Sequence, residues 1–198
     1  WLNTTIGAIP GAMPALGGWA ASSNELSPNA WILFAILFLW QHPHFYAIAL
    51  MCKDDYKKAG FKMLPSISKN LDSTLFQIIF FTVALIVSSI GIYLLNLTSF
   101  VYMLGAVLLG IIFLLYSSNI LFKQSNKEVR KLFIFSIIYL PLLMILIILS
   151  LLIFFSAILL NIFGVFPITL AFIIAILMYV FTGILPIRDL YKQVDWPI

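Results

Sequence analysis

The chain alternates long apolar segments with short polar ones. The apolar segments cover residues 6–21, 30–51, 74–95, 100–122, 132–163 and 168–185, and the polar links between them are rich in Asn, Ser, Pro and charged residues. A segment of about 20 apolar residues is long enough to cross a bilayer as a helix. The pattern therefore predicts about six membrane segments joined by short loops.

Three of these segments contain irregular features. Residues 6–21 are rich in Gly and Pro, which suits either local unwinding beside a cavity or a kinked packing helix without a site. Pro43 is expected to break the second segment. Residues 132–163 would form a helix of about 48 Å, longer than one crossing needs, so this segment tilts, breaks near Pro141, or contains a junction near residue 150.

Composition restricts the class of protein. The chain has 198 residues, of which 63% are hydrophobic and 9% charged, and its mean hydropathy is +1.12. The apolar runs lack the two-residue alternation of a membrane barrel. The class is therefore all-α, a polytopic transmembrane helical bundle. Cys52, the one cysteine, excludes an internal disulfide framework.

Positive charge is confined to three places along the chain. All eleven Lys and Arg lie within residues 53–69, 123–131 and 188–192. Threading the segments alternately through a bilayer puts all three clusters on one face, which the positive-inside rule makes cytoplasmic. The net charge of +4 thus reflects membrane topology and does not indicate nucleic-acid binding. We expect a multi-pass protein of the bacterial inner membrane.

The densest ionisable cluster follows the second apolar segment. Lys53, Asp54, Asp55 and Tyr56 precede Lys57 and Lys58. Carboxylates beside lysines suit a divalent cation and the anionic group that it bridges. Neighbouring helical residues point about 100° apart, so both carboxylates could face one ion only in a loop or at a helix end. The alternative is a solvated turn with local ion pairs.

Two histidines, His42 and His44, flank Pro43 close to the predicted membrane surface. A histidine there can bind a metal or haem iron, or hydrogen-bond a propionate. It can equally be a polar anchor at the interface.

Three blocks resemble one known family in order and spacing. They are NTTIGAIPGAMPALGGW at 3–19, FLWQHPHF at 38–45 and DDYKKAGFKMLP at 54–65. The resemblance is to the protoheme IX farnesyltransferases (haem O synthases), which are UbiA-type intramembrane prenyltransferases, and it extends to about residue 148. It implies transfer of a farnesyl group from farnesyl diphosphate to a vinyl group of haem b, assisted by Mg²⁺.

The resemblance also implies roles for individual residues. Asp54, Asp55 and Tyr56 match the second acidic motif as catalytic residues, and the two aspartates would bind the metal. His44 matches a His-Phe pair and is the candidate for haem contact, whereas His42 departs from the family pattern. The candidates for diphosphate binding are Lys53, Lys57, Lys58 and Asn3. Haem A synthase or cytochrome oxidase assembly proteins are implied as partners, besides haem b, farnesyl diphosphate and the lipid bilayer.

The remainder of the sequence departs from that family. The family's first acidic motif would lie upstream of Trp1, where no initiator Met stands, so we expect a partial prenyltransferase bundle that lacks about four helices and is inactive alone. We assign residues 1–149 to the C-terminal part of the prenyltransferase. Residues 150–198, especially FGVFPITLAF at 163–172 and TGILPIRDLYKQVDWP at 182–197, resemble a piece of a divalent-anion or sodium symporter. They would be extra membrane segments, from either a natural fusion or a chimeric join.

Two alternatives to an enzyme remain open at this point. The chain could be a fragment of a membrane anion transporter, whose polar site residues would lie near the middle of the bilayer. It could also be a structural or assembly protein, in which Asp54, Asp55 and the lysines would point into lipid headgroups and would not converge on a cavity.

Overall fold

The computed structural model describes residues 2–67, 71–95 and 97–184, and everything described is helix, turn or irregular chain. Four helices are long and apolar enough to cross a membrane: α2 (Pro28–Met51), α5 (Asp72–Leu94), α6 (Phe100–Phe122) and α7 (Asn126–Ile147). This arrangement confirms the predicted helical membrane bundle.

These four helices form a closed bundle. α2 packs on α5, α5 on α6, α6 on α7, and α7 returns to α2. The core between them is formed by large side chains that solvent does not reach, such as Leu85, Phe113, Leu132 and Tyr139. Phe76, Leu108 and other outward-facing apolar side chains are exposed, as expected of a surface that faces lipid.

Polar contacts join the helices inside the bundle. The hydroxyl groups of Thr82 and Ser117 lie 3.1 Å apart, and those of Ser89 and Tyr139 lie 3.3 Å apart. Hydroxyl pairs of this kind are a usual means of fixing helix contacts in membranes, where apolar burial alone does not drive association.

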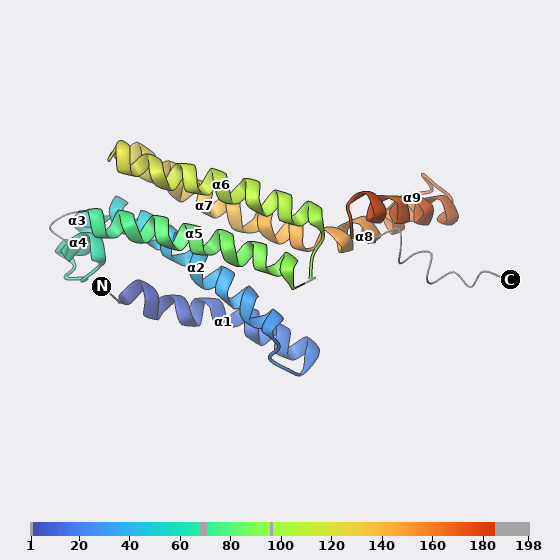
Figure 1. Cartoon of the computed structure of the whole chain (residues 1–198), viewed down its shortest axis with the longest axis horizontal. Helices are drawn as coiled ribbons and strands as arrows, with labels where there is room; N and C mark the ends of the chain where they lie inside the picture. Colours follow the sequence, from blue (N-terminus) through green and yellow to red (C-terminus); the bar gives the residue numbers. More distant parts are fainter. Residues whose placement is uncertain (1, 68–70, 96, 185–198) are drawn as a thin grey trace.

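α1 (Asn3–Ser23) packs against the outside of α2 and completes the part of the fold that holds the candidate site (Figure 1). It stays helical through Pro10 and Pro14. Pro43 likewise lies inside α2, so the expected helix break there is wrong. Packing of α2 against α1, α5 and α7 compensates for the single hydrogen bond that Pro43 cannot make.

The polar link after α2 is more ordered than a loop. It contains two short helices, α3 (Lys53–Lys58) and α4 (Leu64–Ile67). Figure 1 shows α3, α4 and the turn between α6 and α7 at the same end of the bundle. Two of the three positive clusters therefore share one end, apart from Lys69, which lies outside the described residues along with Arg188 and Lys192.

The overlong fifth segment divides into two helices. α7 begins at Asn126, inside the predicted charged loop, and α8 (Leu149–Ile162) follows Ile148. Pro141 lies within α7, so the break is not there. α8 and α9 (Ile168–Phe181) form a hairpin beyond the end of α7, with a small core of their own that includes Ala157, Ala171 and Ala175.

At 14 residues each, α8 and α9 are shorter than a full crossing. The division of the chain near residue 150 stays a prediction, and the break at Ile148 falls beside it.

Candidate functional site

The first candidate site is a hollow of about 320 Å³ at the charged end of the fold. It lies between the start of α1, the end of α2 and the segment that carries α3. Its lining residues are Asn3, Thr4, Gly7, Phe45, Tyr56, Phe61 and Met63. A volume of this size is at the lower end of those that hold small organic ligands.

A sharp turn after α3 brings two aromatic rings to this hollow. Gly60 has φ 74°, a left-handed conformation that glycine adopts at little cost. The turn lets the Phe61 N–H donate to the Tyr56 carbonyl at 2.9 Å, a pattern found at many helix ends. The rings of Tyr56 and Phe61 then meet edge to face, with centroids 6.1 Å apart.

The two aspartates lie in the first turn of α3. Both side chains are exposed, and this is the helix-end position at which neighbouring carboxylates could share an ion. In the described ranges no group of three or more His, Cys, Asp or Glu side chains is close enough to hold a metal alone. Asp54 and Asp55 could therefore supply at most part of a coordination shell.

The lysines predicted to bind diphosphate do not all reach the same place. Lys57 and Lys58 are exposed at the end of α3. Lys53 lines a separate hollow of about 150 Å³ with Gln124, Ser125 and Asn126 of the α6–α7 turn. The structure thus brings Asn3 and Tyr56 together but turns Lys53 toward α7.

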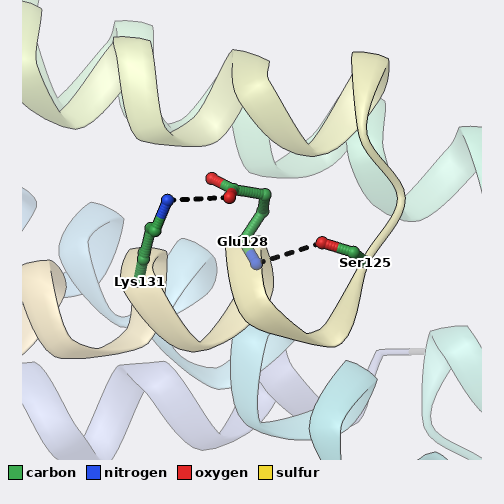
Figure 2. A network of polar contacts seen from close by, with 3 residues as sticks. All are labelled: Ser125, Glu128 and Lys131. Carbon is green, nitrogen blue, oxygen red and sulfur yellow. Dashed lines mark hydrogen bonds and ion pairs between the residues drawn. The ribbon is translucent and has the colours of Figure 1, made fainter.

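The first turns of α7, together with Lys123 in the α6–α7 turn, carry most of the remaining charge at this end. Figure 2 shows how the Ser125 hydroxyl accepts the Glu128 backbone N–H at 3.4 Å, while the Glu128 carboxylate pairs with Lys131 at 2.8 Å. The serine caps the N-terminus of α7, and this cap explains why the helix begins inside a charged stretch.

His44 lies one residue before Phe45 but does not line the hollow. Its Nδ1 atom is 2.8 Å from the Ser136 hydroxyl of α7. The imidazole stacks on the rings of Trp40 and Phe133, with centroids 4.9 and 5.2 Å away. His44 therefore connects α2 with α7 and remains half-buried.

His42 has a different environment, deeper between α1, α2 and α5. Its side chain is 0% exposed. Nδ1 lies 2.8 Å from the Phe38 carbonyl, Nε2 lies 3.3 Å from the Thr5 hydroxyl, and the ring stacks on Phe81. Both ring nitrogens of His42 are thus engaged by other groups of the chain.

A third hollow, of about 310 Å³, lies beside this histidine. Thr5, Phe76, Gln77, Phe80 and Phe81 line it, without a charged side chain. Tyr46 donates a hydrogen bond to the Gln77 amide oxygen at its edge. This largely apolar hollow can hold hydrocarbon, and its two polar lining residues are Thr5 and Gln77.

Several residues that shape the site could not be predicted from sequence. Ser136 and Phe133 lie about 90 positions beyond His44, and no local pattern connects them. Phe61 and Met63 lie within residues 54–65, which resemble the family, but their side chains carry no reactive group. The Gly60–Phe61 pair, just after a charged helix, is the one local signal that could have identified an aromatic turn.

Comparison with known proteins agrees with the resemblance. The sequence model described as the UbiA prenyltransferase family matches residues 1–140. The protoheme IX farnesyltransferase of Solibacter usitatus (strain Ellin6076) is 46% identical over 142 residues, which are 72% of this chain and 49% of that protein. The one from Trichormus variabilis (strain ATCC 29413 / PCC 7937) is 43% identical over 143 residues, 71% of this chain and 45% of that protein.

The protoheme IX farnesyltransferase of Polynucleobacter asymbioticus (strain DSM 18221 / CIP 109841 / QLW-P1DMWA-1) is 40% identical over 141 residues, 71% of this chain and 47% of that protein. The chain spans about half the length of the curated relatives it matches. No solved structure matches it significantly.

Nothing in these matches supports the transporter alternative, and the resemblance of residues 150–198 to a symporter stays a prediction. The family match covers residues 1–140, more than two thirds of the chain, and includes α1 to α6 and most of α7. The chain therefore belongs to the UbiA prenyltransferase family.

Proposed function

We propose that this chain forms part of an enzyme that transfers the farnesyl group of farnesyl diphosphate to a vinyl group of haem b, giving haem O. The observation that carries the proposal is the hollow at the charged end, where Asn3, Tyr56 and Phe61 converge. Asp54 and Asp55 directly precede Tyr56 in α3, but they are exposed and do not line this hollow. The relatives that match the chain are named protoheme IX farnesyltransferase, which supports the choice of substrates.

Asp54 and Asp55 are the residues proposed to hold a divalent ion, which we take to be Mg²⁺. This ion commonly takes one or two carboxylates and completes its shell with substrate phosphate oxygens and water. Two exposed carboxylates with no third acidic, His or Cys ligand among the described side chains fit that pattern. When bound, the metal would neutralise charge on the diphosphate and make it a better leaving group.

The basic and polar residues are proposed to hold the diphosphate. Lys57 and Lys58 are exposed at the end of α3, where they can pair with phosphate oxygens. Asn3, at the rim of the hollow, can donate through its amide. Lys53 would act at longer range, since its side chain lies toward α7.

The aromatic lining suits the reaction that follows. The allylic C–O bond breaks and its electron pair leaves with the diphosphate. The vinyl π bond of haem then attacks the farnesyl cation, and water adds to the resulting carbocation with loss of a proton. Tyr56, as a proposed catalytic residue, and Phe45 present π faces that stabilise cations and exclude bulk water.

We also propose the membrane orientation of the enzyme, the route of its substrates and its partners. The two described positive clusters share one end of the bundle, which supports placing that end in the cytoplasm of a bacterial inner membrane. Haem b and farnesyl diphosphate would enter from the bilayer, where both partition. By family resemblance, haem A synthase or cytochrome oxidase assembly proteins would receive the product.

The test is haem O formation in a bacterium that lacks its own haem O synthase. This chain is produced together with the half of the Solibacter usitatus protein that it does not match, and immunoblots check that both halves are in the membrane. Pigments are extracted and separated by chromatography. We expect haem O from the wild-type pair and a loss of at least about tenfold for Asp55→Asn, since the carboxylate's charge is removed.

Asp72→Asn is the matched control, because Asp72 is also an exposed aspartate in the first turn of a helix near this end. It should leave haem O unchanged. Normal haem O with Asp55→Asn would remove the metal role, and no haem O from a membrane-inserted wild-type pair would contradict the proposed function.

A further inference from the structure

Tyr46 of α2 lies between two of the hollows described above. The hollow at the charged end, of about 320 Å³, and the apolar hollow, of about 310 Å³, share no lining residue. They adjoin in α1, where Thr4 lines the first hollow and the next residue, Thr5, lines the second. Two spaces of similar volume are thus kept apart at one turn of α1.

The Tyr46 hydroxyl is hydrogen-bonded to one residue of each hollow. It donates to the amide oxygen of Gln77, which lines the apolar hollow. It is also hydrogen-bonded to the side chain of Thr4, which lines the hollow at the charged end. Since a phenol has one proton and that proton goes to Gln77, Thr4 is the donor in the second bond. These two bonds link α1, α2 and α5 across the wall between the hollows.

The packing around Tyr46 keeps its ring in this position. The side chain is 1% exposed and belongs to the core of the bundle. Its ring centroid lies 6.2 Å from that of His42, which stacks on Phe81 of the apolar hollow. Moving the ring aside would break both hydrogen bonds of a buried hydroxyl, which is costly. The ring is therefore a fixed part of the wall between the two hollows.

We infer that Tyr46 limits the length of the prenyl chain that the site accepts, because its ring closes the inner end of the hollow at the charged end. The inference rests on the proposed function, which places the diphosphate beside α3. Figure 1 shows the start of α1 at that same end. Asn3 and Tyr56 line the hollow there, and Thr4 and Gly7 line it further along α1. A farnesyl tail that runs inward therefore meets the bond between Thr4 and Tyr46, and a fourth isoprene unit would need the space beyond it.

Removing the Tyr46 ring should join the two hollows. A large-to-small substitution in a packed core leaves a cavity, because the surroundings relax only partly, and an apolar cavity takes up apolar ligands. In Tyr46→Ala a longer prenyl tail would thus reach the space lined by Phe80 and Phe81. Tyr46→Phe loses the hydroxyl but keeps the ring, so the wall between the hollows should remain.

The test compares two donors in lipid nanodiscs that hold the chain and the unmatched half of the Solibacter usitatus protein. A photoreactive farnesyl diphosphate analogue labels the pair, and farnesyl or geranylgeranyl diphosphate suppresses the label. We expect the wild-type pair to need at least about tenfold more of the longer donor, and the two donors to be nearly equal with Tyr46→Ala. Tyr46→Phe should keep the wild-type ratio. So should Tyr139→Ala, which removes an equally buried tyrosine that lines neither hollow.

The results separate this inference from the proposed function. Tyr46→Leu shortens the side chain but keeps it apolar, so it replaces Tyr46→Ala if that variant fails to insert. A wild-type ratio in the inserted variant, or an equal loss of selectivity with Tyr139→Ala, would overturn the role of Tyr46 even if the pair makes haem O. A wild-type pair that binds farnesyl diphosphate but makes no haem O would refute the proposed transfer alone. Label that farnesyl diphosphate does not suppress would refute both.

Discussion

Gly11 lies where α1 meets α2, and a side chain there would collide with Gln41. A Cβ atom at Gly11 would stand 2.2 Å from the Gln41 amide oxygen. Gln41 is 7% exposed, and its amide donates to the carbonyls of Ala8 and Leu37 at 3.4 and 3.2 Å. α1 also carries Asn3 and Gly7, which line the hollow. The contact between Gly11 and Gln41 therefore helps to fix the position of these lining residues.

Gly11→Ala should displace the Gln41 amide from these acceptors. A buried amide left without partners costs about 1–3 kcal/mol. Replacing Gly by Ala within a helix, by itself, stabilises the folded state by about 0.5–1 kcal/mol. We therefore expect Gly11→Ala to lower the free energy of unfolding by about 0.5–2 kcal/mol.

The assay is SDS-induced unfolding in mixed micelles, followed by tryptophan fluorescence, with Trp19 and Trp31 in α1 and α2 as reporters. In a Gln41→Ala background the collision is gone, so Gly11→Ala should instead stabilise by about 0.5–1 kcal/mol. Gly17→Ala is the control, because a Cβ atom there meets nothing within 4 Å. If Gly11→Ala has the same effect in both backgrounds, the described contact between α1 and α2 is wrong.

Three further substitutions test other parts of the fold by the same unfolding assay. Tyr139→Phe removes a hydroxyl 3.3 Å from Ser89 and should cost about 0.6 kcal/mol, the average for such bonds in membranes; an increase in stability would contradict the polar core. Ser125→Ala removes the cap of α7 and should cost about 1 kcal/mol, whereas no change would mean that α7 begins elsewhere. Gly60→Ala forces an alanine to φ 74°, should cost about 1–2 kcal/mol, and should expose the chain after α3 to protease; unchanged cleavage would contradict the turn.

Helix positions followed closely from sequence where apolar runs had clear polar ends. The run 100–122 became α6 with those bounds, and 74–95 became α5 with a shift of two residues at most. The fold class depends only on such runs, because in a bilayer the backbone must satisfy its own hydrogen bonds. The start of α7 was missed because Lys127, Glu128 and Lys131 resemble a loop, although Ser125 and Glu128 have the spacing of a helix cap.

Proline was the residue type that sequence reasoning misjudged. A helix break was predicted at Pro43 and considered near Pro141, but both prolines lie inside continuous helices. Tertiary packing on neighbouring helices outweighs the one lost hydrogen bond. The break that does occur, at Ile148, has neither Pro nor Gly beside it. The excess length of the apolar run, for which a junction near residue 150 was one explanation, pointed to it.

The candidate site likewise has features that the sequence predicts and features that it does not. Tyr56 and Asn3 were predicted from motifs and meet at one hollow, because short connections keep α1, α2 and α3 adjacent. The contact of His44 with Ser136, 92 positions away, and the direction of Lys53 toward the α6–α7 turn depend on how distant helices close the bundle. One sequence read without an alignment carries no signal for such pairs.

Photoaffinity labelling tests most directly whether the hollow at the charged end binds the prenyl donor. The chain, paired with the unmatched half of the Solibacter usitatus protein, is irradiated with a farnesyl diphosphate analogue that carries a diazirine near its diphosphate, and labelled peptides are identified by mass spectrometry. We predict label within residues 3–7 and 45–63, which unlabelled farnesyl diphosphate suppresses. Label confined to the outward faces of α5 and α6, or to the α8–α9 hairpin, would contradict the assignment.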